Sequence, residues 1–234
     1  MCTRFVYHGS DIITGFNFDI DLSVWTHKII KEKDRFCIGI LRTDGIWHSY
    51  HGVNRNGNAG TLLYVHGNTS GAYSDDDNCI TISDLTERFI KAQISFDEVL
   101  NIAETKKIVY AQDATMQAML SDMNGNTLII EPGIGYREER GKYSLITNYS
   151  LIKPESTKAF IVPGDNRYEE ALHFLEGHKN KFSVSDAFKL LYTVRQVGEW
   201  GTRVSFVYSA NEGAVYYTEN HDFGNIRRLT FSAS

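Results

Sequence analysis

Apolar and polar residues alternate along most of the first third of the chain, with the period of two that is typical of half-buried β-strands. Strand-like segments occupy residues 3–9, 11–21, 36–54 and 57–68. The four residues from His8 to Asp11 predict a hairpin turn between the first two segments, and Asp44-Gly45 predicts another turn within the third. The first third is therefore expected to consist of strands joined by tight turns.

The hydrophobic period changes between residues 83 and 112. Apolar positions there fall at helical spacing, and we predict two helices. Ser83 or Asp84 is expected to cap the first helix, because the side-chain oxygens of such residues accept hydrogen bonds from free backbone N–H groups. Ser95, followed by two acidic residues in the first turn, is expected to begin the second helix.

The second half of the chain repeats the order of strands followed by helices. Its predicted elements are strands in 114–133 and 142–150, helices at 165–176 and 183–194, and a closing hairpin in 201–222. Strands and helices that cluster in this way are typical of α+β layers rather than of alternating βαβ units. No linker, repeat or low-complexity segment interrupts the chain, so we predict a single domain over residues 1–234.

Charge and composition exclude several classes of protein. The formal net charge is −5, so the chain lacks the basic surface of a nucleic-acid-binding protein. No apolar run approaches the ~20 residues of a membrane-spanning helix. Asp11, Asp19 and Asp21 interrupt the N-terminal stretch, so no signal peptide is predicted. The odd number of cysteines suits a reducing compartment. We expect a cytoplasmic protein with neither a membrane nor a nucleic-acid partner.

The residue types that bind metals form no recognisable ligand set. The cysteines contain no CxxC pair, and three histidines lie close in sequence with two of them on predicted turns; these residues are Cys2, Cys37, Cys79, His48, His51 and His66. We therefore predict no metal site and no cofactor.

Cys2 is the residue that suggests chemistry. It directly follows Met1, and because its side chain is small, an aminopeptidase is expected to remove that methionine. The thiol and a free α-amine would then belong to one residue. Their unperturbed pKa values are about 8.5 and about 7.7–8.0, so near neutral pH part of the amine is free to accept the thiol proton. The alternative is an idle small residue at a frayed chain end.

Five segments occur in the order and spacing of one known family. They are MCT at the start, GFNFDID, SDMNGNTLIIEPG, LITNYS and the closing RVSFVYSANEGAVYY. In this respect the chain, from Cys2 to about Phe223, resembles the N-terminal-nucleophile hydrolases of the choloylglycine hydrolase family, which includes bile salt hydrolases and penicillin V acylases. The resemblance implies a four-layer αββα sandwich with two mostly antiparallel sheets between helical layers.

The resemblance also implies an activity and a set of catalytic residues. It predicts hydrolysis of a linear, non-peptide amide bond of a small N-acyl substrate through a thioester on Cys2. Asp19 would orient the α-amine, and Asn148 together with the backbone N–H of Tyr64 would form the oxyanion hole. Independently of the family, Asn148 interrupts the apolar run SLITNYSLI, and a buried amide must find hydrogen-bond partners.

Substrate contacts are predicted less directly. Asn17 lies two residues before Asp19 on the same strand face and is a candidate for binding substrate. Phe16 stands where the family has an arginine beside the thiol. A second family arginine aligns near Glu170, and Arg167 or Arg203 could replace it from another position. Loss of both charges would weaken activation of the thiol.

Two alternatives stay open from the sequence. An acyltransferase would use the same thioester with an amine in place of water. A non-catalytic relative would have kept the fold and a ligand pocket while losing the family arginines. Trp25, Trp47 and Trp200 could line an apolar acyl pocket or pack in the core. The family further implies a homo-oligomer, a dimer or a tetramer.

Overall fold

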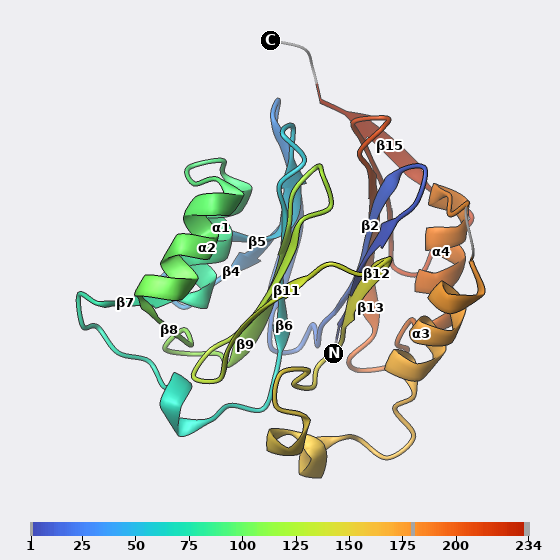
Figure 1. The fold of residues 1–234 in the computed structure, drawn as a ribbon. Helices are drawn as coiled ribbons and strands as arrows, with labels where there is room; N and C mark the ends of the chain where they lie inside the picture. Colours follow the sequence, from blue (N-terminus) through green and yellow to red (C-terminus); the bar gives the residue numbers. More distant parts are fainter. Residues whose placement is uncertain (1, 179–180, 232–234) are drawn as a thin grey trace.

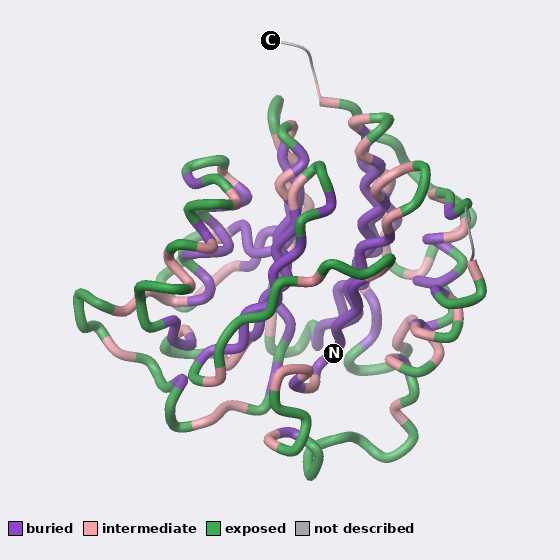
Figure 2. Tube along the Cα trace, viewed as in Figure 1, coloured by how far each residue is buried: buried purple, intermediate pink, exposed green. Residues whose placement is uncertain are grey.

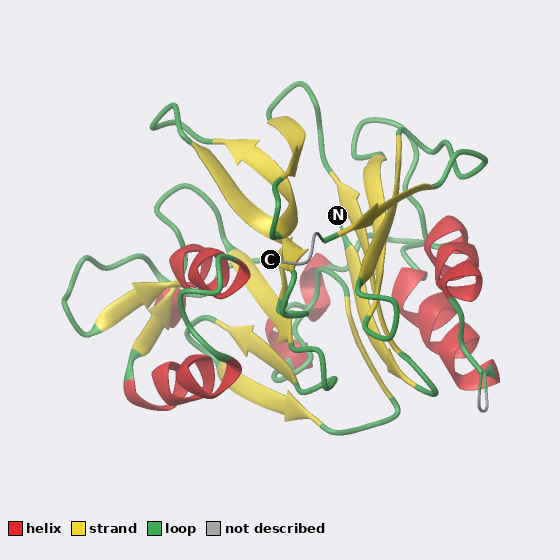
Figure 3. Ribbon diagram, turned by 90° about the horizontal axis from the view of Figure 1, so that it is seen from above, coloured by secondary structure: helices red, strands yellow, loops and turns green. Residues whose placement is uncertain are grey.

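Two large antiparallel sheets face each other and are covered on their outer sides by helices (Figures 1 and 3). The structure is a computed structural model that describes residues 2–178 and 181–231. The layers run helices, sheet, sheet, helices. This arrangement confirms the α+β sandwich with two antiparallel sheets that the sequence predicted.

The first sheet holds the N-terminal strand. Its six strands, in spatial order, are β12 (Tyr143–Ile146), β1 (Thr3–His8), β2 (Ile12–Asp19), β13 (Thr202–Ser209), β14 (Ala214–Glu219) and β15 (Arg227–Thr230). The register pairs Thr3 with Asn17, and Asp19 with Thr202. The start of β1, the end of β2 and the start of β13 therefore meet at one end of this sheet.

The second sheet faces the first across the core. Its seven strands, in spatial order, are β11 (Gly135–Glu139), β10 (Thr127–Glu131), β9 (Met116–Ser121), β6 (Ala59–Tyr64), β5 (Trp47–Asn54), β4 (Arg35–Leu41) and β3 (Thr26–Lys31). Strands β5 and β6 are paired only at Gly52–Gly60 and Val53–Ala59. Beyond that point the two strands separate, which leaves space between them.

Helices cover the outer face of each sheet. Helix α1 (Ile82–Ile90) packs on β5, β6 and β9 with α2 (Phe96–Thr105) beside it, and α3 (Arg167–Gly177) and α4 (Val184–Thr193) pack on the first sheet. The shorter elements are the parallel pair β7 (Cys79–Thr81) and β8 (Lys107–Val109), and the 3-10 turns η1 (Thr69–Gly71), η2 (Pro154–Ser156) and η3 (Lys158–Phe160). None of the helices in the described ranges is long and apolar enough to cross a membrane.

The inner faces of both sheets form the main core, and buried backbone runs through the centre of both sheets (Figure 2). Large apolar side chains fill it, among them Phe16, Phe36 and Phe206, all with no exposed surface. A second apolar cluster lies between the first sheet and helices α3 and α4. Burial of this apolar area is the main favourable contribution to folding.

The tight turns fall where the sequence placed them. Gly45, Gly125 and Gly213 have positive φ values of 76°, 83° and 54° between paired strands. Ser95 caps α2 through a complete capping box, and Ser183 does the same for α4. The predicted cap of α1 is wrong. Thr81 caps that helix, because its hydroxyl accepts from the N–H of Asp84 and places Ser83 inside the first turn.

Candidate active site

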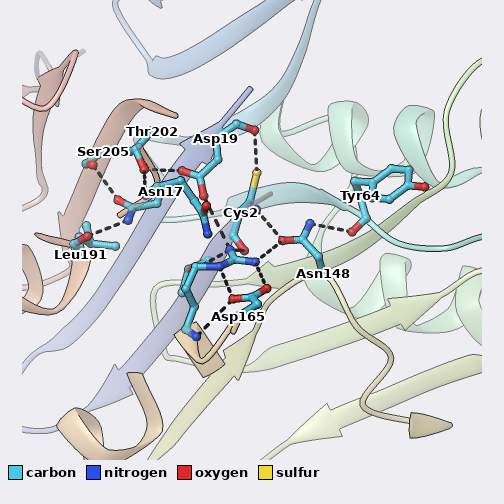
Figure 4. Close-up of polar contacts among 12 residues, drawn as sticks. Cys2, Asn17, Asp19, Tyr64, Asn148, Asp165, Leu191, Thr202 and Ser205 are labelled. Atoms are coloured by element: carbon cyan, nitrogen blue, oxygen red, sulfur yellow. Dashed lines mark hydrogen bonds and ion pairs between the residues drawn. The ribbon is translucent and has the colours of Figure 1, made fainter. Parts of the chain in front are cut away.

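Cys2 lies immediately before β1, and its side chain is buried between polar partners (Figure 4). Its backbone nitrogen donates to Oδ1 of Asn148 at 2.7 Å, and its thiol donates to the backbone carbonyl of Asp19 at 3.7 Å. Burial raises the pKa of the Cys2 thiol to about 11. The resting group is therefore a thiol, and a nearby base is needed to make it a nucleophile.

Asn148 follows β12 in a segment that is held on both sides. The side chain of Gln117 on β9 donates to the carbonyls of Thr147, at 2.8 Å, and Tyr149, at 3.2 Å. Nδ2 of Asn148 donates to the carbonyl of Tyr64 at 2.8 Å. An amide carries two N–H groups, so one more remains for a ligand.

The segment after Asn148 is fixed by a buried carboxylate. Glu131 ends β10 and is 3% exposed. It accepts from the hydroxyl of Ser150 and from the backbone N–H groups of Leu151, at 2.7 Å, and Ile152, at 3.1 Å. Glu131, at the end of the hairpin, thus holds the loop that presents Asn148.

The backbone of Tyr64 points to the same place. The N–H of Val65 bonds the carbonyl of Thr115 on the neighbouring strand, at 3.2 Å. Bonded and non-bonded pairs alternate along an antiparallel ladder, so the amide and carbonyl of Tyr64 both point away from that strand. The carbonyl accepts from Asn148, and the N–H of Tyr64 therefore lies on the Asn148 side of the strand.

Asp19 is the last residue of β2, with a side chain that has no exposed surface. Oδ1 accepts from the hydroxyl of Thr202 at 2.6 Å, and Oδ2 lies 3.7 Å from Nη1 of Arg167. Burial raises the pKa of Asp19 to about 7, against the opposing charge of Arg167. This carboxyl group therefore changes its charge near neutral pH.

Arg167 supplies a cation to the site. It is the first residue of α3, and its guanidinium makes bonds of 2.8 and 2.7 Å to the two carboxylate oxygens of Asp165. It also donates to the carbonyl of Cys2 at 3.0 Å and to Oδ1 of Asn148 at 3.2 Å. Burial opposes its charge, but Asp165 and Asp19 outweigh that effect and raise the pKa of Arg167.

Three residues predicted to bind substrate lie elsewhere. Phe16 is fully buried, with its ring 5.2 Å from that of His51. The side chain of Asn17 points toward α4, where it bonds the carbonyl of Leu191, at 2.8 Å, and the hydroxyl of Ser205, at 2.7 Å. Arg203 bonds backbone carbonyls; these belong to Ile20, Gly198 and Glu199. Among the described residues, none of the three has a hydrogen bond to Cys2.

A pocket of about 220 Å³ opens beside Cys2. Its walls are mainly apolar, with Phe18, Ile40, Leu62 and Met116 among them. Trp25 and Trp200 also line it, which agrees with their interpretation as residues of an apolar pocket. Trp47 does not line this pocket, and the ammonium group of Lys28 lies over its ring. The pocket offers an apolar group of a substrate a place beside the thiol.

Polar residues of the pocket wall were missed from the sequence. His51 lies on β5 with 4% exposure, and Arg42 and Asp113 form an ion pair at the pocket. The sequence draws attention to His51 only as a candidate metal ligand together with two other histidines. It is the folded chain that places His51, Arg42 and Asp113 in the wall of the pocket that contains Cys2. Within the described residues, no group of three or more His, Cys, Asp or Glu side chains is arranged to hold a metal ion.

No protein-family model and no curated protein sequence matches this chain. Solved structures match its fold. A variant of conjugated bile acid hydrolase from Clostridium perfringens has a TM-score of 0.71 and 15% identity, covering 98% of this chain and 92% of that chain. Penicillin V acylase from Agrobacterium tumefaciens has a TM-score of 0.69 and 15% identity, covering 98% and 86%.

The third neighbour is a more distant amidase. The Caenorhabditis elegans ortholog of N-acylethanolamine-hydrolyzing acid amidase has a TM-score of 0.60 and 16% identity, over 89% of this chain and 93% of that chain. The chain thus shares its fold with these three proteins, which is the fold that the sequence resemblance implied. The similarity extends over nearly the whole chain.

Proposed function

We propose that this protein is an amide hydrolase that cleaves the linear C–N bond of a small N-acyl substrate with Cys2 as its nucleophile. The observation that carries the proposal is the position of the Cys2 nitrogen, 2.7 Å from Oδ1 of Asn148. That atom becomes a free α-amine once Met1 is removed. Met1 itself lies outside the described residues, so its removal is part of the proposal.

In the first step the α-amine takes the thiol proton of Cys2. The thiolate attacks the amide carbonyl carbon, and a C–S bond forms as the carbonyl oxygen becomes an oxyanion. The tetrahedral intermediate collapses, the C–N bond breaks, and the α-ammonium group gives its proton to the departing amine. A high thiol pKa, about 11 before processing, makes this internal base necessary.

In the second step water cleaves the thioester. The α-amine of Cys2 accepts a proton from the water as its oxygen attacks the acyl carbon. When the second intermediate collapses, the C–S bond breaks and the proton returns to sulfur. The products are a free acid and the regenerated thiol. An amine in place of water would give acyl transfer, so adding a nucleophilic amine to the assay separates the two reactions.

The oxyanion would be stabilised by two N–H donors, Nδ2 of Asn148 and the backbone N–H of Tyr64. Both point to one side of β6, and the carbonyl of Tyr64 fixes the Asn148 amide in place. Donors held in advance in this way need no reorganisation during the reaction. The apolar pocket beside Cys2 supports a substrate with an aromatic or fatty acyl group.

Arg167 and Asp19 would act as positioning residues. Arg167 contacts the carbonyl of Cys2 and the side chain of Asn148, and Asp19 faces the same guanidinium. The non-catalytic alternative depended on the loss of both family arginines. A buried cation beside Cys2 supports the enzyme over that alternative.

The test compares two forms of one polypeptide. The chain is expressed behind a cleavable partner so that cleavage leaves Cys2 as the first residue, and hydrolysis of a panel of N-acyl amides is measured before and after cleavage. We expect activity only after cleavage, and none in a cleaved Cys2→Ala variant. Equal activity before and after cleavage would overturn the role of the α-amine, and activity in Cys2→Ala would overturn the nucleophile.

A further inference from the structure

His51 is a buried histidine that the proposed mechanism does not use. It lies on β5, 4% exposed, and its ring packs 5.2 Å from Phe16 and 4.9 Å from Phe18. It also lines the pocket that contains Cys2. A polar ring in these surroundings requires hydrogen-bond partners for both of its nitrogens.

Among the described residues, only one of the two ring nitrogens has a hydrogen-bond partner. Nδ1 accepts from the backbone N–H of Leu62 at 3.1 Å. This bond assigns the neutral tautomer with its proton on Nε2. Burial also lowers the pKa of His51 to about 3, so the ring stays neutral at working pH. Nε2 is therefore a hydrogen-bond donor without a partner in the described ranges.

The strand itself is arranged to present this ring. The pairing of β5 with β4 shifts register between Ile38, opposite His51, and Gly39, opposite Ser49. Such a bulge redirects side chains and is frequent beside active sites. On the other edge of β5, Nδ1 of His51 accepts a hydrogen bond from the backbone N–H of Leu62. It replaces a backbone partner at the point where β5 and β6 separate.

Nε2 also remains open to the pocket. The polar side-chain atoms that are fully enclosed and unpartnered in the described residues do not include it. The neighbouring residues of the pocket wall include the apolar side chains of Phe18 and Leu62. A donor in such a wall leaves a hydrogen bond unmade when the pocket holds a purely hydrocarbon group, which is costly.

We propose that His51 determines specificity by donating from Nε2 to an oxygen within the apolar acyl group of the substrate. The preferred acyl group would then carry an ether, keto or hydroxyl oxygen along its chain instead of being a plain hydrocarbon. This inference rests on the proposed function in one respect, because it takes the apolar group that the pocket binds to be the acyl group of a substrate. The donor and its pocket do not depend on catalysis, so binding alone can test them.

The test measures binding to Cys2→Ala protein, which keeps the pocket without turnover. The ligands are the N-methyl amide of octanoic acid and three analogues with an ether oxygen in place of the third, fourth or fifth chain carbon. At least one ether should bind about fivefold more tightly than the hydrocarbon, as one neutral hydrogen bond allows.

Two amide variants separate the roles of the two nitrogens of His51. In His51→Asn the side-chain oxygen still accepts from Leu62, but the Nε2 donor is gone. In His51→Gln the amide nitrogen replaces the Nε2 donor. We expect the ether preference to fall to about one in His51→Asn and to persist in His51→Gln, while binding of the hydrocarbon by His51→Asn changes by less than about twofold.

The outcomes distinguish this inference from the proposed function. Hydrolysis of the same amides by processed protein with Cys2 intact is measured in parallel. An ether preference that disappears in His51→Asn supports the His51 donor even if no amide is hydrolysed, a result that would count against the proposed function alone. Hydrolysis with equal binding of all four ligands, or an ether preference unchanged in His51→Asn, would overturn the inference.

Discussion

Two arginines are buried in this protein under opposite conditions. Arg167 lies beside Cys2 with two carboxylates, Asp165 and Asp19, within ion-pair distance. Arg4 is fully buried between the sheets, and none of the described carboxylates pairs with it. Its guanidinium bonds the hydroxyl of Ser121 at 2.9 Å and a backbone carbonyl, while Nε has no partner.

The pKa values of the two groups differ accordingly. Burial lowers the pKa of Arg4 to about 9, whereas the carboxylates around Arg167 outweigh its burial and raise its pKa. A buried charge is expensive unless it is paired and hydrogen-bonded. Beside Cys2, Asp165 and Asp19 offset the free-energy cost of burying the Arg167 cation. In the interior, none of the described carboxylates offsets the cost of burying Arg4. From this contrast we expect Arg167 to contribute to the candidate site, and the buried charge of Arg4 to reduce the stability of the fold.

The largest effect is expected from Arg167→Met. It leaves Asp165 and Asp19 buried without their cation, and breaking a buried pair in this way costs about 3–5 kcal/mol. Chemical denaturation should show that loss, together with a fall in amide hydrolysis. Arg167→Lys keeps the charge and should recover part of both. A Met variant as stable and active as the parent would break the contrast between the two arginines.

The next effect concerns the donor that Arg167 helps to hold. Asn148→Asp keeps an oxygen for the Cys2 nitrogen and for Arg167 but removes the Nδ2–H donors. Loss of one oxyanion donor lowers kcat by roughly 10²–10³. Steady-state kinetics should show this fall with little change in KM. An Asp variant with the parent's kcat would exclude Asn148 as an oxyanion donor.

Asp19 makes stability depend on pH in a lower range than Arg4 does, because the pKa of Asp19 is about 7 and that of Arg4 about 9. Burial raises the pKa of Asp19 to about 7 from its ordinary value of 3.8, so the folded state holds a proton that the unfolded state releases. The resulting stability is present in full below about pH 4 and is lost as pH rises through about 7. Relative to Asp19→Asn, the free energy of unfolding should fall over this range. A pH-independent difference between the two proteins would contradict the raised pKa.

The smallest effect is expected from Arg4→Met. Replacing an unpaired buried cation by an apolar side chain of similar length should leave stability unchanged or raise it by about 1 kcal/mol. Hydrolysis should not change, because the hydrogen bonds of the Arg4 guanidinium within the described residues go to Ser121 and the carbonyl of Phe5, neither of which belongs to the proposed catalytic set. Denaturation and kinetics on this variant also serve as the matched control for Arg167→Met. Marked destabilisation would mean that Arg4 has a partner of its own.

Most of the strands and helices could be predicted from hydrophobic period and turn residues, whereas the sandwich of two sheets was implied only by the family resemblance. The strands missed were chiefly β3, β11 and β15, which lie at sheet edges. Edge strands carry charged residues that discourage pairing with other chains, as in the sequences THKIIK and GYREE. Their hydrophobic alternation is weak for that reason, and a pattern based on burial does not detect them.

The candidate site could be predicted only in part. Cys2, Asp19, Asn148 and Tyr64 carry motif or family signals, and the structure brings all four together. Spacing placed Asn17 on the face of Asp19 but did not reveal that this face meets α4. In the sequence His51 could be weighed only as one of three histidines that could bind a metal, because its position beside Cys2 depends on a bulge in β5 and on the short pairing of β5 with β6.

The most direct test of the account is the intact mass of the protein caught during turnover. Freshly processed protein is mixed with excess N-acyl amide, quenched in acid and examined by mass spectrometry with peptide mapping. The account predicts a chain that lacks Met1 and carries one acyl group on Cys2 as a thioester. An active protein that retains Met1, or one that carries the acyl group on another residue, would contradict it.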